Sequence, residues 1–245
     1  MNPRRICLWS GPRNVSTALM YAFAQRSDAC VVDEPLYAYY LRTTGVDHPG
    51  RAEVLAHMDA DGRHVVEDVI LGPCDRPVLF MKQMAHHLVG LDRGFLRQTD
   101  NVLLIRDPSE MLPSLAKNIP NPTLRDTGLK MQSDLFNELR SLGQHPPILD
   151  ARQLLLDPRG VLSILCDQLA ISFEEAMLSW PEGARPEDGI WAPHWYENVH
   201  RSKGFQPYQP KTATLSESLQ LLLEECRPYY EALEATAIRA RTEKK

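Results

Sequence analysis

Two short segments of the chain carry side chains of the kinds that bind phosphate groups in proteins. The first runs from Gly11 to Thr17 and reads GPRNVST, so that a cation precedes two hydroxyl groups. The second begins at Arg106, and Ser114 follows eight residues later. A guanidinium group can donate two parallel hydrogen bonds to a phosphate, and a hydroxyl adds one more donor. These residue types predict a binding site for a small anion.

The first segment lies between a predicted strand and a predicted helix. Residues 6–9 form an apolar run within the predicted strand 5–10, and residues 15–25 have apolar side chains at helical spacing. A turn between a strand and a helix directs backbone N–H groups at one point, where the helix dipole adds roughly half a positive charge. Arg13, Ser16 and Thr17 lie at this turn, which we interpret as a phosphate cradle. The alternative is an ordinary turn capped by a serine or threonine.

The cradle differs from a Walker A loop, which needs a second glycine and a lysine before its serine or threonine. Neither residue lies between Gly11 and Ser16, and this disfavours an ordinary ATPase or kinase. Arg106 follows the clearest apolar run of the chain. Open parallel sheets bind ligands beyond the carboxyl ends of their strands, so we expect Arg106 near the cradle. Its alternative is a structural ion pair with Asp107 or another carboxylate.

Continuous apolar runs alternate with helical patterns along the chain, and continuous runs are typical of strands covered on both faces of a parallel sheet. We therefore predict a single three-layer α/β/α domain over residues 1–245, with a central parallel sheet. A loop-rich lid is predicted at 180–211 and a polar tail at 239–245. Longer helical patterns cover 123–142 and 216–235. The predicted strands are 5–10, 29–32, 77–82, 101–106 and 147–150.

The composition restricts the class of protein. The chain has 245 residues, of which 43% are hydrophobic, enough for a sizeable core. Its net charge of −5 disfavours a nucleic-acid partner. No apolar run approaches the length of about 18 residues that a membrane span needs, so we expect no membrane insertion. The five cysteines form no C-x-x-C pair, which predicts reduced thiols in a cytoplasmic protein and no metal site. The oligomeric state stays open, and a homo-oligomer is possible.

Together the two segments resemble the motifs of sulfotransferases that use 3′-phosphoadenosine 5′-phosphosulfate (PAPS). In that family a P-[KR]-S-G-T-T loop holds the 5′-phosphosulfate, and residues 12–17 are similar to it in order. An R-D-P segment with a serine eight residues after the arginine holds the 3′-phosphate, and Arg106 with Ser114 is similar to it. The loop looks closest to that of bacterial sulfotransferase-like proteins that read W-S-G-P-R-N-V-S-T. The resemblance implies a P-loop NTPase-like fold and a PAPS site formed by Arg13, Asn14, Val15, Ser16, Thr17, Arg106 and Ser114.

A third, weaker similarity lies at residues 201–205, which read RSKGF. They resemble the late R-K-G segment that closes over the 3′-phosphate, with one residue inserted, so the resemblance adds Arg201, Lys203 and Gly204 to the nucleotide site. Val15 departs from the family pattern, because glycine usually stands at its position. A positive φ angle is strongly disfavoured for a β-branched residue. Either the loop keeps a negative φ at Val15, or the cradle is altered.

An acceptor must lose a proton as it attacks sulfur, so we expect a base near the cradle. Glu34 is our first choice, because some bacterial and carbohydrate sulfotransferases have a glutamate in a similar E-P-L segment. Its alternative is a structural ion pair with Arg13 or Lys82. His86 and His87 are second choices, since they are out of register with the base histidine of the cytosolic family members. Lys82 either neutralises charge at the bridging oxygen or extends to solvent.

The predicted function is sulfuryl transfer from PAPS, as co-substrate, to a hydroxyl or amine of a small-molecule acceptor. Glu34, Arg13 and Lys82 are the predicted catalytic residues, and the scheme requires no metal. Two alternatives remain. One is an ATP-dependent phosphotransferase on a similar scaffold, and the other is a non-catalytic nucleotide-binding or interaction module. The tryptophans of the lid, such as Trp180 and Trp195, either cover the acceptor site or pin the lid to the domain.

Overall fold

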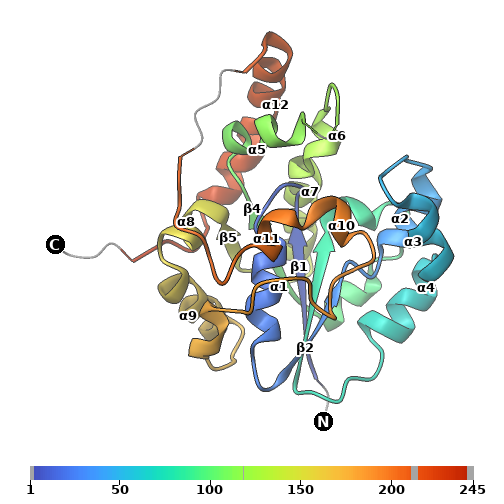
Figure 1. Cartoon of the computed structure of the whole chain (residues 1–245), viewed down its shortest axis with the longest axis vertical. Helices are drawn as coiled ribbons and strands as arrows, with labels where there is room; N and C mark the ends of the chain where they lie inside the picture. The colour runs from blue at the N-terminus through green and yellow to red at the C-terminus, as the bar shows by residue number, and fades with distance from the viewer. Residues whose placement is uncertain (1–2, 118, 211–214, 242–245) are drawn as a thin grey trace.

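The five strands found in the described part of the chain belong to one sheet, in the order β2-β3-β1-β4-β5. The computed structural model describes residues 3–117, 119–210 and 215–241. Every strand pair is parallel, which confirms the predicted central parallel sheet (Figure 1). The strands are β1 (Arg4–Ser10), β2 (Ala29–Asp33), β3 (Val78–Met84), β4 (Asp100–Ile105) and β5 (Ile148–Asp150).

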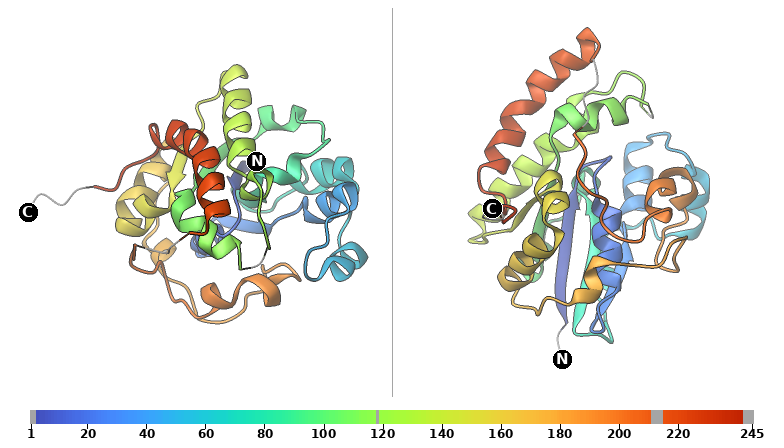
Figure 2. Two further views of the ribbon diagram at one scale, coloured as in Figure 1. Left: turned by 90° about the horizontal axis from the view of Figure 1, so that it is seen from above. Right: turned by 60° about the vertical axis from the view of Figure 1, so that its left-hand side comes forward.

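Helices cover both faces of the sheet and so form the predicted three layers (Figure 2). The α-helices are α1 (Ser16–Ala24), α2 (Tyr37–Thr44), α3 (Arg51–His57), α4 (Gly62–His64), α5 (Pro108–Leu115), α6 (Leu124–Thr127), α7 (Leu129–Ser141), α8 (Ala151–Leu156), α9 (Pro158–Gln168), α10 (Ala192–Trp195), α11 (Glu197–His200) and α12 (Glu217–Glu234). Shorter turns of 3₁₀-helix are η2 (Ala85–Leu88), η3 (Gly94–Gln98) and η4 (Glu175–Leu178), and η1 (Val65–Ile70) is a π-helix.

The central strand β1 shows why the apolar runs are continuous. Ile6 and Leu8 are fully buried under the layer that contains α1 and α9. Cys7 and Trp9, which point to the opposite face, are fully buried under the layer that contains α7 and α12. Successive side chains of a strand alternate between faces, so a strand covered on both sides needs apolar residues at every position.

The helix predicted over 123–142 is two helices in the structure, because the chain turns at Gly128. This residue has a φ of 74°, which favours glycine, and a Cβ atom added to it would lie 3.3 Å from the Cα atom of Gly11. The break therefore brings the start of α7 against the cradle.

In the predicted lid, 180–210, the regular structure is the two short helices α10 and α11, and residue 211 lies outside the described residues. Of the predicted tail, 242–245 lie outside them too. Among the described residues, the structure contains no helix that is long and apolar enough to cross a membrane.

Candidate active site

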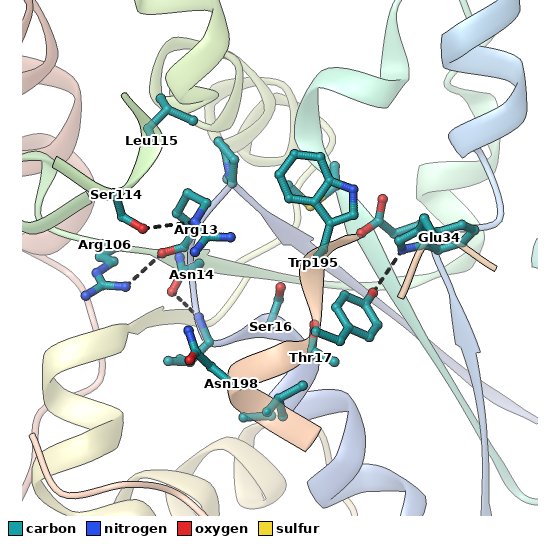
Figure 3. A pocket seen from close by; sticks show the side chains of 18 of the residues that line it. Arg13, Asn14, Ser16, Thr17, Glu34, Arg106, Ser114, Leu115, Trp195 and Asn198 are labelled. Carbon is teal, nitrogen blue, oxygen red and sulfur yellow. Dashed lines mark hydrogen bonds between the residues drawn. The ribbon is translucent and has the colours of Figure 1, made fainter. Parts of the chain in front are cut away.

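A cavity of about 610 Å³ lies at the edge of the sheet where β1, β2, β3 and β4 end (Figure 3). Residues 11–18 of the cradle line it on one side, and parts of the loop-rich segment 180–210 line it on another. The structure thus brings together predicted residues from distant parts of the chain. Those that line the cavity are Arg13, Asn14, Val15, Ser16, Thr17, Glu34, His86, His87, Arg106, Ser114 and Gly204.

The backbone of the cradle is arranged so that Val15 keeps a negative φ of −91°. The positive φ falls on Arg13, at 54°, which is unusual for a residue other than glycine. Gly11 is needed for space, since a Cβ atom added there would lie 2.9 Å from the backbone oxygen of Thr127. Of the two possibilities for the loop, the structure has the first, and Val15 introduces no strain at its own position.

Two side-chain amides fix the cradle to the sheet. The Nδ2 of Asn14 donates to the backbone oxygen of Leu104 at 3.0 Å, and its Oδ1 accepts from the N–H of Val15 at 2.8 Å. The Nε2 of Gln132 on α7 donates to the backbone oxygens of Trp9 and Leu104, at 3.0 and 2.8 Å. These bonds join the ends of β1 and β4 beneath the loop.

Helix α1 begins directly after the cradle, and Ser16 and Thr17 form its start. The N-cap position is Val15, and no side chain among the described residues caps this end of the helix. The first N–H groups of a helix have no partner within the helix, and the dipole makes that end attractive to anions. An uncapped N-terminus that lines a cavity is therefore suited to hold an anionic group.

Arg106 and Ser114 both contact the cradle, as expected from the place of Arg106 at a strand end and from the family resemblance. Asp107 caps α5 by accepting a hydrogen bond from the N–H of Ser109 at 2.8 Å, and Ser114 lies two turns further along this helix. The Oγ of Ser114 accepts from Nε of Arg13 at 3.0 Å, and Nη1 of Arg106 donates to the backbone oxygen of Arg13 at 2.7 Å. The two motifs thus form one contact network (Figure 3).

This end of the cavity carries an excess of positive charge. Nη2 of Arg106 lies 3.5 Å from Glu110, while its buried Nε has no hydrogen-bond partner among the described residues. Burial lowers the pKa of Arg13, and the nearby charge of Arg106 lowers it further. Two guanidinium groups beside one carboxylate, with one buried donor unpaired among the described residues, are suited to hold an anion.

Glu34 lies on the other side of the cavity, directly after β2. Its φ of 39° is unusual for a residue other than glycine, and such a conformation costs on the order of 1 to 3 kcal/mol. Its carboxylate accepts a short hydrogen bond from Nζ of Lys82, and burial raises the pKa of this carboxyl group. Strained residues of this kind cluster at functional sites.

Lys82 adopts neither of the two predicted positions. It is 2% exposed and is absent from the lining of the cavity, because Nζ is turned to Asp33, Glu34 and the hydroxyl of Tyr196. An ammonium group has three N–H donors, and these three acceptors use all of them. Two carboxylates on the neighbouring strand end thus outcompete solvent for the lysine, and its role at a bridging oxygen stays a prediction.

His86 and His87 line the cavity as neutral groups. Burial lowers the pKa of His86 to about 3 and holds that of His87 well below its usual range. His87 is stacked against Tyr37 and Tyr40, with ring centroids 5.2 and 4.7 Å apart. Nδ1 of each histidine is buried without a hydrogen-bond partner among the described residues.

Several cavity residues were not predicted from the sequence. The wall around Glu34 is largely aromatic, and its members come from α2 and from the lid: Tyr37, Tyr40, Trp191, Trp195 and Tyr196. Of these, Trp195 was expected either to cover the acceptor site or to pin the lid, and it lines the cavity. For Tyr37 and Tyr40 the available signal was the tyrosine-rich run that follows Glu34. Trp180 does not belong to this wall, since it is 4% exposed and packs edge-on against Tyr21 in the core.

The late segment is placed differently from the prediction. The side chains of Arg201 and Lys203 are 73% and 74% exposed and pair with Glu197 and Glu182, away from the cavity. Ser202 and Gly204, the residues that follow each of them, line the cavity instead. Arg201 is the C-cap of α11, and the chain after it is irregular, so the alternation of a regular strand could not be used to predict which of these residues face the site.

A group of possible metal ligands lies elsewhere. Cys30, Cys74 and Asp75 place their ligand atoms within 4.8 Å of one another, and none of the three lines the cavity. The scheme without a metal in the cavity stays a prediction.

Comparison with known proteins gives a family and a fold. The sulfotransferase-domain family model matches residues 4–237. Two curated proteins of Arabidopsis thaliana are similar, branched-chain-amino-acid aminotransferase-like proteins 2 and 1, with 43% identity over 226 residues and 42% over 232. The matches cover 92% and 94% of this chain but 40% and 42% of those proteins. The chain thus spans about two fifths of the length of these relatives.

Solved structures share the fold at low identity. The sulfotransferase domain from the curacin biosynthetic pathway has a TM-score of 0.52 and 17% identity, covering 92% of this chain and 98% of that one. The sulfotransferase domain of the Synechococcus PCC 7002 olefin synthase has a TM-score of 0.54 and 17% identity, and the match covers 91% of this chain and 94% of that one. A sulfotransferase from Alicyclobacillus acidocaldarius has a TM-score of 0.54 and 11% identity, and the match covers 98% of both chains. This likeness confirms the predicted P-loop NTPase-like fold of the sulfotransferase type.

Proposed function

This chain belongs to the sulfotransferase domain family, and we propose that it transfers a sulfuryl group from PAPS to a hydroxyl or amine of a small acceptor. The main support is the meeting of Arg13, Arg106 and Ser114 in one cavity that Glu34 also lines. Arg13 and Ser114 are 101 residues apart in sequence. A purely structural contact between them would not explain why both lie at an opening with an unpaired buried guanidinium donor.

The residues of the positive end fit a nucleotide with phosphate groups at two positions. The cradle and the uncapped start of α1 suit the 5′ group, because they offer a guanidinium, hydroxyls and free helix N–H groups. Arg106 suits the 3′-phosphate, because its buried Nε lacks a partner among the described residues. We assign Arg13, Asn14, Val15, Ser16 and Thr17 to the 5′ group, and Arg106, Ser114 and Gly204 to the 3′-phosphate. Arg201 and Lys203 would first have to leave their ion pairs on the surface.

Glu34 is the proposed base. PAPS supplies the sulfuryl group, which the acceptor's oxygen or nitrogen takes while the bond from sulfur to the nucleotide breaks. Glu34 removes the acceptor's proton, and burial makes its carboxylate more basic than an exposed one. Arg13 stabilises the negative charge that remains on the nucleotide's phosphate. The neutral histidines and aromatic rings around Glu34 surround the acceptor.

Isothermal titration calorimetry tests the donor assignment with 3′-phosphoadenosine 5′-phosphate (PAP), the product nucleotide. We expect PAP to bind and Mg²⁺-ATP to bind far more weakly. Arg106→Ala should weaken PAP binding, whereas Arg97→Ala, which removes an exposed cation remote from the cavity, should not. Tight binding of Mg²⁺-ATP with no response to PAP would refute the assignment and favour a phosphotransferase. PAP binding without turnover of PAPS on any acceptor would favour a non-catalytic nucleotide-binding module.

A further inference from the structure

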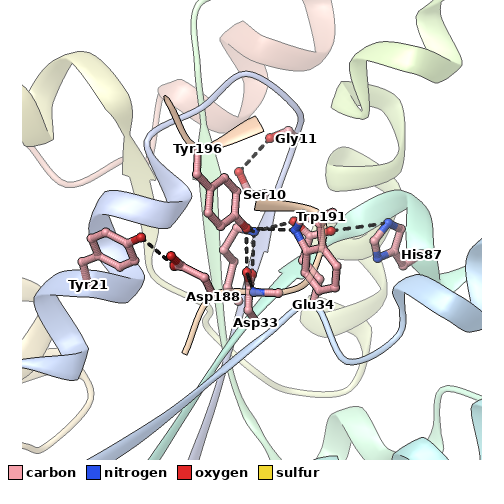
Figure 4. Close-up of polar contacts among 11 residues, drawn as sticks. Ser10, Gly11, Tyr21, Asp33, Glu34, His87, Asp188, Trp191 and Tyr196 are labelled. Atoms are coloured by element: carbon pink, nitrogen blue, oxygen red, sulfur yellow. Dashed lines mark hydrogen bonds and ion pairs between the residues drawn. The ribbon is translucent and has the colours of Figure 1, made fainter. Parts of the chain in front are cut away.

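Lys82 lies at the centre of a buried polar cluster that joins β2, β3 and the lid. Figure 4 shows three of its members, Asp33, Glu34 and Tyr196, close together. Its Nζ donates to Oδ1 of Asp33 at 2.8 Å, to Oε1 of Glu34, and to the hydroxyl of Tyr196 at 2.7 Å. Burial alone would lower the pKa of Lys82, but the two carboxylates outweigh burial and hold this pKa well above its usual range. Lys82 is therefore a permanent buried cation.

Two carboxylates share this one cation, and their surroundings differ. Oδ2 of Asp33 accepts from the hydroxyl of Tyr196 at 2.7 Å and from the N–H of Gly189 at 3.0 Å, so both its oxygens are bound. Glu34 gives one oxygen to Lys82, and its other oxygen lies 3.9 Å from Nε2 of His87. Asp33 is 7% exposed and does not line the cavity, whereas Glu34 does.

The other groups against Glu34 do not add a positive charge. His87 on η2 is neutral, because burial holds its pKa low. Burial also raises the pKa of Tyr37 on α2, and that of Tyr196, so both hydroxyls keep their protons. Among the described residues, Lys82 is thus the cation that pairs with Glu34, and Asp33 is the carboxylate that competes for it.

The partners of Asp33 apart from Lys82 come from the lid. Gly189 and Tyr196 donate to it directly, and Nε1 of Trp191 donates to the Tyr196 hydroxyl at 3.1 Å. The stretch 189–196 also supplies the lid's part of the aromatic wall, namely Trp191, Trp195 and Tyr196. The docking of this wall and the sharing of the lysine charge therefore depend on the same carboxylate.

We propose that Asp33 is a positioning residue that takes up most of the charge of Lys82 and anchors residues 189–196, so that Glu34 stays available as a base only while this part of the lid is docked. The charge sharing holds for the protein as such, while its link to catalysis rests on the proposed function. Without Asp33, the charge of Lys82 would act on Glu34 alone and would make it a weaker base. An opposite charge within 4 to 6 Å lowers a carboxyl pKa by about 1 to 3 units.

The test compares Asp33→Asn with Asp188→Asn. Asp188 also anchors the lid, by accepting from the hydroxyl of Tyr21 at 2.6 Å and pairing with Nε2 of His200 at 2.9 Å. Among the described residues, it forms no hydrogen bond or ion pair with Lys82. Carbon-13 NMR of the Glu34 carboxyl group, without any ligand, follows its titration directly. We expect its midpoint to fall by about 1 to 3 pH units in Asp33→Asn and to stay in place in Asp188→Asn.

Two further measurements complete the test. The acid limb of the kcat/KM profile should move to lower pH in Asp33→Asn, with a lower plateau, because a weaker base needs less alkaline conditions to ionise but accepts the proton less readily. Hydrogen exchange of residues 189–196 should become faster in Asp33→Asn and also in Tyr196→Phe, which removes a neutral hydroxyl and keeps the fold testable if the first variant does not fold.

The outcomes separate this inference from the proposed function. If the titration of Glu34 and the exchange of 189–196 are unchanged in Asp33→Asn while Glu34→Gln abolishes turnover, the inference is wrong and the function stands. If Tyr196→Phe is the only variant that folds and its 189–196 exchange is unchanged, the inference is wrong as well. If the Glu34 titration shifts as expected while PAP fails to bind, the charge sharing stands and the function is wrong.

Discussion

Replacing Arg106 by alanine should weaken the binding of a nucleotide with a 3′-phosphate far more than the binding of one without it. In the structure, Nη1 of Arg106 supports the cradle through the backbone oxygen of Arg13, Nη2 pairs loosely with Glu110 at 3.5 Å, and Nε has no partner among the described residues. The substitution therefore removes one contact with the loop, and it also removes a cation whose Nε is available to a ligand. The loss of the loop contact affects nucleotides with and without a 3′-phosphate, whereas the loss of the cation affects only those with one.

The sizes of the two losses differ. A hydrogen bond to a charged group contributes about 1.5 to 3 kcal/mol, which corresponds to roughly a 10- to 150-fold change in Kd. The loop contact is also made by the guanidinium, but it lies within the protein and acts on the nucleotide only through the cradle, so we expect its loss to cost nucleotide binding about 1 kcal/mol, or roughly fivefold. We therefore expect Arg106→Ala to raise the Kd for PAP by both factors, and the Kd for AMP, which lacks the 3′-phosphate, by only the smaller one.

Calorimetry of wild type and Arg106→Ala with PAP and AMP gives the four Kd values of a complete cycle. Thermal unfolding of the same samples controls for damage to the fold, and Arg97→Ala controls for the loss of one positive charge. The wild type should prefer PAP over AMP, and the variant should lose most of this preference. An equal loss for both nucleotides would show that Arg106 acts only through the loop, and would refute its assignment to the 3′-phosphate.

The remaining predictions concern the cradle, the base and the late segment. Gly11→Ala should lower Tm by about 2 to 12 °C and weaken PAP binding, because its Cβ atom would lie 2.9 Å from a backbone oxygen and overpacking costs about 1 to 3 kcal/mol. The control Gly94→Ala meets only a side-chain oxygen at 3.3 Å and should change Tm little. Equal losses of Tm in the two variants would contradict the crowding at Gly11. The kcat/KM of the wild type should fall as pH drops through the raised pKa of Glu34, since the base must be ionised; a steady-state pH profile with no acid limb would remove Glu34 from this role. Arg201→Ala should change the Kd for PAP, measured by calorimetry, less than threefold, because this side chain pairs with Glu197 on the surface. A loss of PAP affinity as large as that of Arg106→Ala would mean that the late segment closes over the nucleotide.

The sequence was sufficient to predict the sheet and the meeting of the two motifs. Residues such as Ile6 and Cys7 are adjacent and both apolar, which occurs in strands buried on two faces and seldom elsewhere. Parallel strands end at the same edge, so Arg13 after β1 and Arg106 after β4 were bound to lie near each other once the fold was known. Local rules of this kind depend on few residues and are robust.

Features that depend on contacts between distant segments were not predictable in the same way. Lys82 was expected to reach solvent or the cavity, but Asp33 and Tyr196 compete for it, and Tyr196 is 114 residues away. The sequence pattern of 123–142 predicts one helix, but the chain turns at Gly128, where this glycine packs against Gly11 with a positive φ. This contact is between segments far apart in the sequence, so the pattern could not predict it. The available signal for the buried cluster was the acidic pair Asp33 and Glu34 at the end of one predicted strand, together with Lys82 at the end of another.

The most direct test of the proposed function is the release of PAP from PAPS in the presence of a mixed set of small alcohols, phenols and amines. Liquid chromatography would follow PAP, and mass spectrometry would detect acceptors heavier by one sulfuryl group. We predict that wild type forms PAP together with a sulfated acceptor, and that Glu34→Gln binds PAP normally but forms at least a hundredfold less of both. Failure of wild-type protein to bind PAP, or equal product formation by Glu34→Gln, would contradict the assignment of donor site and base.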